Sequence, residues 1–304
     1  MAPSFHRALD RLALGLEDRV RRGSQPYRPG PDGSLAVFGS LGPLPPPPDA
    51  PGPWTARSPP PYSGDQLWVH VAAARGARRG TAILVPPWKL RWRMLLGGWV
   101  RLLASTGHET WLLVPPHHLE RTASGARGGE GFVSADLGAL RDALSQTVLE
   151  VRLLAALAAA RSPREEVALV GLSLGALAAA WAATGPERVD AAALVAPPAD
   201  LAAVLRGTPL GLRYAALAAR AGEPLPPWPE LEARLRPLSP LDRRPTARRV
   251  LVAGGADDAI ALDGPAALAR RWGLPLSRWP RGHLTLLFGC KGLRREVRAL
   301  LGAG

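Results

Sequence analysis

The chain has 304 residues, 47% of them hydrophobic, which is enough to bury a full core and is typical of a folded globular protein. Its formal net charge is +13, but arginine outnumbers lysine 36 to 2 and asparagine is absent. That skew is typical of a GC-rich genome, and no aromatic residues interleave with a basic patch, so we expect no nucleic-acid partner.

The single cysteine, Cys290, excludes an intramolecular disulfide and fits a reducing compartment. The N-terminal residues show no apolar core with a small-residue cleavage site, so no secretory signal is predicted. Together these observations predict a cytoplasmic protein.

The first 64 residues differ in pattern from the rest. Apolar side chains at helical spacing over residues 5–22 predict a helix docked on the body of the protein. Ten prolines lie between Pro43 and Pro61, and a segment so rich in proline cannot form a core element. We therefore divide the chain into an N-terminal helix and proline-rich arm, residues 1–64, and one domain, residues 65–304.

Within that domain, apolar runs of strand length alternate with helical segments. Strands are predicted at residues 66–71, 81–85, 110–114, 167–171 and 191–196, and again from residue 250. Helices are predicted at residues 92–105, 135–160 and 174–183, with a final amphipathic helix after residue 284. Two or three short helices rich in proline and arginine are expected within residues 197–244. This alternation predicts an α/β fold with a mostly parallel sheet that helices cover on both faces.

The most informative segment is an apolar run followed by Gly-Leu-Ser-Leu-Gly at residues 171–175 and then an alanine-rich helix. This pattern is typical of a nucleophile elbow, a strained strand-to-helix turn that exposes the hydroxyl of a serine, here Ser173. Residues 167–186 carry no charge and have the length of a membrane span, but this turn divides them. We therefore expect no stable membrane insertion.

Two later loops hold the groups that a serine nucleophile needs. Asp257 and Asp258 follow a buried run that starts at residue 249, and His283 stands in a loop before the final helix. A serine hydroxyl needs a base within hydrogen-bond reach, and the imidazole needs a carboxylate that holds its tautomer. With the order Ser, Asp, His, the chain resembles the α/β-hydrolase superfamily over roughly residues 65–304.

The resemblance implies an α/β-hydrolase fold with a small helical cap at about residues 197–244. It implies Ser173 as nucleophile, His283 as general base and Asp258 as the orienting acid, with Asp257 as the alternative acid. It also implies that the backbone N–H of Leu174 is one donor of an oxyanion hole.

The second oxyanion donor is expected after the strand that ends at Val85. Many relatives carry His-Gly there, whereas this chain has Val-Pro-Pro-Trp at residues 85–88. Proline has no N–H, so Trp88 is the earliest available donor. The same string is similar to the corresponding site of polyhydroxyalkanoate synthases and depolymerases, although the synthases carry cysteine where this chain has Ser173.

A polar cluster follows the strand at residues 110–114. Loops at the carboxyl ends of parallel strands face the crevice of an open sheet, so His117, His118 and Arg121 are candidates to bind the substrate, together with Lys89 and Arg91. The alternative is that the loop is simply polar surface. Neighbouring histidine side chains diverge, and we expect neither a metal nor a cofactor.

These observations predict a serine hydrolase that cleaves a carboxylic ester or related acyl bond of a small-molecule substrate through an acyl-serine. One alternative is acyl transfer by the same three residues to an acceptor other than water. Another is a non-catalytic protein of the same fold that binds a ligand or partner. The residues leave open the acyl-chain length, the choice among ester, thioester and amide, and the oligomeric state.

Overall fold

A computed structural model describes residues 9–10, 39–90, 93–126, 128–132, 137–220, 224–261 and 263–302. The helix predicted over residues 5–22 lies outside the described residues except for residues 9 and 10. Arg91 also lies outside them.

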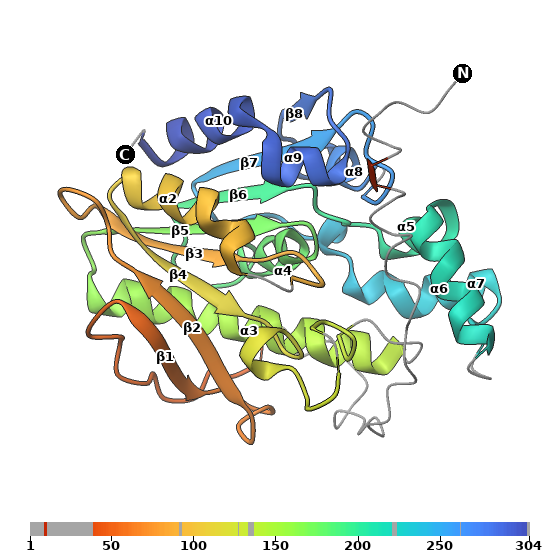
Figure 1. The fold of residues 1–304 in the computed structure, drawn as a ribbon, viewed down its shortest axis with the longest axis horizontal. Coiled ribbons are helices and arrows are strands. Elements are labelled where there is room, and N and C mark those ends of the chain that lie inside the picture. The colour runs from red at the N-terminus through yellow and green to blue at the C-terminus, as the bar shows by residue number, and fades with distance from the viewer. Residues whose placement is uncertain are drawn as a thin grey trace.

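Eight strands form a single sheet in the order β1-β2-β4-β3-β5-β6-β7-β8 (Figure 1). From β4 to β8 every neighbouring pair is parallel, whereas β2 runs antiparallel to both β1 and β4. The strands are β1 (Gly52–Arg57), β2 (Gln66–Ala72), β3 (Gly80–Val85), β4 (His108–Val114), β5 (Glu166–Leu172), β6 (Ala191–Val195), β7 (Arg249–Gly255) and β8 (Leu276–Trp279). The mostly parallel sheet predicted from the alternation of patterns is confirmed.

The helices lie on both faces of this sheet. They are α2 (Gly97–Ser105), α3 (Leu137–Arg161), α4 (Leu174–Ala182), α5 (Leu201–Gly207), α6 (Pro209–Arg220), α7 (Trp228–Leu235), α8 (Gly264–Trp272), α9 (His283–Gly289) and α10 (Lys291–Gly302). Short 3-10 turns are η1 (Arg93–Leu96), η2 (Leu119–Arg121), η3 (Arg236–Leu238) and η4 (Pro240–Asp242).

The core has two layers because successive side chains of a strand point to opposite faces. In β3, Ile83 belongs to the layer that α3, α4, α7 and α8 cover, whereas Leu84 belongs to the layer under α2, α9 and α10. Both side chains are fully buried. A strand that is covered on both faces favours apolar residues at successive positions, which explains the apolar runs of β3 and β5.

Among the described residues, α3 is the one helix that is long and apolar enough to cross a membrane. Of its most apolar window, 83% is buried inside the protein, which is typical of a core helix. The uncharged stretch 167–186 forms β5 and α4 with a turn between them, as predicted.

Two edge strands were not predicted. β1 falls inside the proline-rich segment, where we expected no core element; residues 52–57 add an edge strand to the sheet, although none of them is fully buried. Pro53 is tolerated because an edge strand has one side whose N–H groups need no partner in the sheet. The side chains of β1 alternate between half-buried and exposed, so β1 forms the border of the core. β8 closes the opposite edge.

Residues 197–244 contain α5, α6, α7 and two 3-10 turns. The three helices lie together at one end of the molecule, beyond the end of β6 (Figure 1). Asp200 caps α5, since its Oδ1 accepts the N–H of Ala203 at 2.9 Å.

Candidate active site

The turn from β5 to α4 holds Ser173 in an unusual backbone conformation, with φ 55° and ψ −120°. A non-glycine residue rarely adopts a positive φ, and such strain persists only where the surroundings enforce it. They do so here because the chain passes very close to itself. A Cβ on Gly171 would lie 2.5 Å from the Cα of Ala176, and one on Gly175 would lie 2.3 Å from the carbonyl oxygen of Val85.

The three groups predicted to meet do lie in one hydrogen-bonded chain. His283 Nε2 is 2.8 Å from Ser173 Oγ, and His283 Nδ1 is 2.8 Å from Asp258 Oδ2. All three side chains are buried. Of the two adjacent acids that the sequence left open, Asp258 is the one whose carboxylate contacts the imidazole.

The topology of the sheet explains why these residues converge. β5, β6 and β7 are parallel neighbours, so the loops that follow β5 and β7 emerge at the same edge. Ser173 follows β5, and Asp258 follows β7. His283 is the first residue of α9 rather than a loop residue as expected, and the helix start brings its ring between the other two groups.

The electrostatics of the pair favour a charged carboxylate beside a basic imidazole. Burial opposes ionisation of Asp258, but His283 and two backbone N–H groups outweigh it and lower the pKa of Asp258. Those N–H groups belong to Ile260 and Ala261, each 2.8 Å from Asp258 Oδ1. Burial also disfavours the charged imidazole, but attraction to Asp258 outweighs it, and the pKa of His283 is raised.

The two predicted oxyanion donors lie at the start of α4 and after β3. Leu174 is the first residue of α4, so its N–H has no acceptor one turn earlier in the helix. Gly175 packs against the carbonyl oxygens of Val85 and Pro86, so the loop that carries Trp88 begins beside the Ser173 turn. The N–H of the next residue, Lys89, already has an acceptor.

That acceptor is His118, which has a different position from the one predicted. Its ring is buried with 1% exposure and lies edge-on to Phe132. Nδ1 is 2.8 Å from the carbonyl oxygen of Pro116, and Nε2 is 3.1 Å from the N–H of Lys89. Nδ1 therefore donates and Nε2 accepts, which is the pattern of a neutral imidazole. Burial is the main cause that lowers the pKa of His118 to about 4.

The expectation that His118 binds the substrate is therefore corrected, because both ring nitrogens hold backbone groups. The Trp88 indole makes a second link to the same loop, with Nε1 donating to the carbonyl oxygen of Gly129 at 2.7 Å. His118 and the carbonyl group of Gly129 thus hold residues 88–89 in place.

Arg121 also points inward, against the prediction that it contacts substrate. Its side chain is 5% exposed, and its guanidinium donates to Glu150 Oε2 at 2.8 Å and to the carbonyl oxygen of Val114 at 3.0 Å. Glu150 lies in α3 and is fully buried. It also accepts hydrogen bonds from Ser58 and Gln146, so the pair is well satisfied. Burial nevertheless raises the pKa of Glu150.

The remaining two candidates of that cluster are held by local contacts. His117 has φ 63°. Its ring packs so closely on Gly131 that a Cβ at position 131 would lie 2.6 Å from His117 Nδ1. Burial is the main cause that lowers its pKa. Lys89 Nζ lies 4.4 Å from the centre of the Trp88 ring, a cation–π contact. The sequence contains no signal for the directions in which these side chains point, since those directions depend on how the loop packs on α3.

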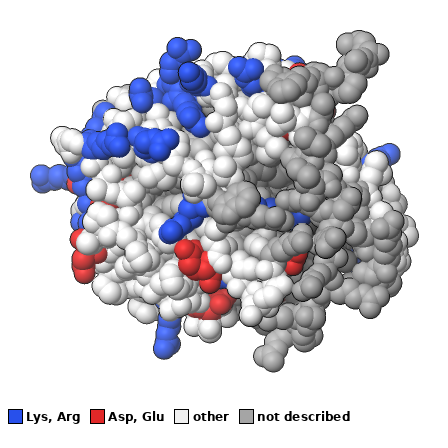
Figure 2. Space-filling model, viewed as in Figure 1, with Lys and Arg blue, Asp and Glu red and all other residues white. Residues whose placement is uncertain are grey.

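Within the part of the chain that the structure describes, no group of three or more His, Cys, Asp or Glu side chains is arranged to hold a metal ion. Basic side chains gather over α2 and α10 on the face that Figure 2 shows. The sequence of α10 includes four basic residues, Lys291, Arg294, Arg295 and Arg298.

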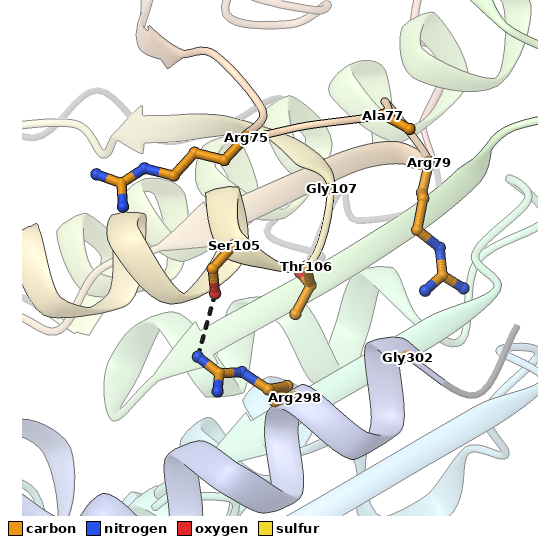
Figure 3. Close-up of a pocket in the computed structure, with 8 residues that line it drawn as sticks. All are labelled: Arg75, Ala77, Arg79, Ser105, Thr106, Gly107, Arg298 and Gly302. Carbon is orange, nitrogen blue, oxygen red and sulfur yellow. Dashed lines mark hydrogen bonds between the residues drawn. The ribbon is translucent and has the colours of Figure 1, made fainter.

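A shallow pocket of about 330 Å³ lies near this basic region (Figure 3). Its lining residues are Arg75, Ala77, Arg79, Ser105, Thr106, Gly107, Arg298 and Gly302. It adjoins the first residues of β3 and β4. It therefore lies at the N-terminal ends of the parallel strands, whereas Ser173 lies at their C-terminal ends. Helices α2 and α10 both end there, and arginine charges are favourable near the negative C-terminal end of a helix dipole. Arg298 also donates to Ser105 Oγ at 3.2 Å.

Comparison with solved structures gives the same fold. A carboxyl esterase from Bacillus coagulans has a TM-score of 0.54 and 13% identity, covering 84% of this chain and 97% of that one. An esterase from Pyrococcus furiosus has a TM-score of 0.53 and 15% identity, covering 84% and 92%. An acylaminoacyl peptidase from Pyrococcus horikoshii has a TM-score of 0.57 and 14% identity, covering 84% of this chain but 40% of that one.

At the level of sequence, no curated protein matches the chain. The family model described as "Serine hydrolase" matches residues 140–295, just over half of the chain. That range includes Ser173, Asp258 and His283. The α/β-hydrolase fold and this match agree, and the chain belongs to the serine hydrolase family.

Proposed function

We propose that this protein hydrolyses carboxylic esters of small molecules through an acyl-enzyme on Ser173. The observation that carries the proposal is the buried hydrogen-bonded chain from Ser173 through His283 to Asp258. A serine hydroxyl is a weak nucleophile by itself, and an imidazole at 2.8 Å is the base that activates it.

In the first half of the reaction, Ser173 Oγ attacks the ester carbonyl carbon while His283 Nε2 takes the hydroxyl proton. The tetrahedral intermediate then collapses, and the departing alcohol takes that proton from His283. In the second half, water attacks the acyl-serine while His283 takes one of its protons, and His283 then returns this proton to Ser173 Oγ as the carboxylic acid leaves. Asp258 keeps the proton on Nδ1 and stabilises the imidazolium in both halves.

The negative oxygen of the intermediate needs donors that are already in place. The N–H of Leu174 and that of Trp88 are the groups we assign to this role. The assignment of Trp88 rests on the two prolines before it and on the use of the next N–H, that of Lys89, by His118.

Two features of the comparisons support an ester over a peptide substrate. The two esterases match this chain over 92% and 97% of their own lengths. The match to the acylaminoacyl peptidase covers 40% of that protein, so most of the peptidase has no counterpart here.

A fluorophosphonate probe tests the proposal, because it reacts with activated serines. We expect wild-type protein to be labelled and Ser173→Ala to be unlabelled, with p-nitrophenyl ester hydrolysis lost by about 10⁴-fold or more. Ser145→Ala is the matched control, since Ser145 is a buried serine in α3 away from His283. Labelling that persists in Ser173→Ala at the wild-type rate would falsify the assignment.

A further inference from the structure

A carboxylate from the N-terminal segment lies against the backbone of His283. Asp10 is fully buried, and it is 273 residues away from His283 in the chain. Its Oδ2 accepts the N–H of His283 at 2.8 Å, and its Oδ1 accepts the N–H of Leu284 at 3.1 Å. Both oxygens of one carboxylate therefore hold the segment that carries the proposed general base.

These contacts complete the start of α9. The first N–H groups of a helix have no acceptor within the helix, and the residue before it usually supplies one from its side chain. That residue is Gly282, which has no side chain. Thr285 Oγ1 accepts the N–H of Gly282 at 3.1 Å, and Asp10 accepts the N–H groups of the two residues after it. The missing cap is thus provided from the other end of the chain.

The charge of Asp10 acts on the imidazole as well. Burial lowers the pKa of His283, and the charge of Asp10 adds to the attraction of Asp258 that raises it. Within helix α9 itself, His283 is the one residue with a titratable side chain. In the neighbouring loops, the N–H of Asp257 donates to the carbonyl oxygen of Arg281 at 3.1 Å.

We propose that Asp10 is a positioning residue of the active site, which fixes the backbone of His283 while Asp258 fixes its ring. The inference rests on the proposed function of His283. Its basis is geometric: the orientation of the imidazole depends on the backbone that carries it, and both hydrogen bonds of Asp10 end on that backbone. A displacement of about 1 Å in a catalytic group can cost about 100-fold in rate.

The test compares Asp10→Asn and Asp10→Ala with the wild-type full-length protein. We expect kcat for p-nitrophenyl esters to fall about 10- to 100-fold in Asp10→Ala, with KM changed less than about twofold. In Asp10→Asn the acid limb of kcat/KM moves to lower pH, because the limb reports the pKa of His283 and a negative charge that raises it is gone. In an NMR titration, the midpoint of the His283 resonance also moves to lower pH.

Asp190→Asn is the matched control. Asp190 is also a buried carboxylate that accepts a backbone N–H, that of Val167 at 3.0 Å, at the edge of the sheet remote from Ser173. We expect this variant to lose thermal stability while its acid limb and kcat stay as in wild type. The proposal is overturned if Asp10→Asn behaves like Asp190→Asn, with a lower melting temperature and an unmoved acid limb.

The NMR titration separates this proposal from the proposed function. If wild-type protein hydrolyses no ester but Asp10→Asn lowers the pKa of His283, the proposed function fails and the contact of Asp10 stands. If ester hydrolysis proceeds and neither the resonance nor kcat changes in the Asp10 variants, Asp10 is not a positioning residue.

Discussion

Two histidines of this protein have opposite protonation behaviour because their neighbours differ. His283 contacts a carboxylate, which favours the charged ring, and its pKa is raised. His118 contacts only backbone groups through its two nitrogens and is buried, so its pKa falls to about 4. A neutral His118 can accept the N–H of Lys89, whereas a protonated one cannot. The loop that carries Trp88 therefore depends on His118 staying uncharged.

The stability of the protein should depend on pH through His118. The ring has a pKa of about 4 in the folded state, against an ordinary value of 6.5. Between these values the unfolded chain binds more protons, so stability falls as the pH drops. Between pH 7 and pH 5 the loss from this group is about 2 kcal/mol. We expect urea unfolding at both pH values to show that the advantage of wild type over His118→Gln shrinks by this amount.

A difference between wild type and His118→Gln that stays constant from pH 7 to pH 5 would contradict this interpretation. Activity provides a second readout. If the ring supports the oxyanion donor through Lys89, His118→Gln lowers kcat more than it raises KM, because the oxyanion exists only after attack.

At the scale of elements, the segment from residue 115 to residue 131 links the site to the longest helix. It is tied to α3 by the Arg121–Glu150 ion pair and to the loop after β3 by Trp88 and His118. A helix buried in the core is a rigid support, and 83% of the apolar window of α3 is buried. The segment thus connects α3 with the loop of the predicted oxyanion donor Trp88, so the place of that loop depends on its contacts with α3.

Replacing Arg121 should affect both stability and turnover. Arg121→Met leaves Glu150 buried without its cationic partner, which costs about 3 kcal/mol or more in free energy of unfolding. The loop then loses its anchor, so kcat falls as well. Arg152→Met is the matched control, because Arg152 pairs with Glu187 at 2.6 Å in a bridge that is also largely buried, and Arg152 is not part of this segment.

We expect chemical denaturation to give comparable losses for the two variants and kinetics to separate them, with kcat reduced only in Arg121→Met. Equal kcat values in the two variants would show that the segment is merely structural. The double variant Arg121→Met with Glu150→Gln should recover part of the stability, since no buried charge is left unpaired.

At the scale of the whole molecule, the strand that leads to Ser173 is an inner strand of the sheet. β5 and β6 lie in the middle of the sheet with helices on both faces, and every residue of β6 is buried. β1 and β8 lie at the edges, and their side chains are partly exposed. A site at the end of β5 therefore stands on an inner, buried strand, which suits groups that must be held in register.

Hydrogen exchange measured by mass spectrometry should reproduce this order. We expect amides of β5 and β6 to exchange only with global unfolding, and those of β1 and β8 to exchange through local opening with lower free energies. Peptides from β1 that exchange as slowly as those from β5 would contradict the assignment of β1 as a border strand.

The sequence by itself determined the features that depend on near neighbours in the chain. Spacing of apolar residues predicted β3, α4 and the parallel sheet, because strand and helix periods are local properties. The glycines beside Ser173 predicted the tight turn for the same reason. Proline content misled us for residues 52–57, because tolerance of proline depends on a strand being at an edge, which no local pattern reveals.

The tertiary structure alone decided which distant groups meet. It selected Asp258 over Asp257 as the contact of His283, directed His118 and Arg121 inward, and brought Asp10 to the start of α9. Each of these contacts joins segments from 25 to 273 residues apart. Such pairs form only when the whole chain packs, since their geometry is set by the sheet order and the buried surfaces between them.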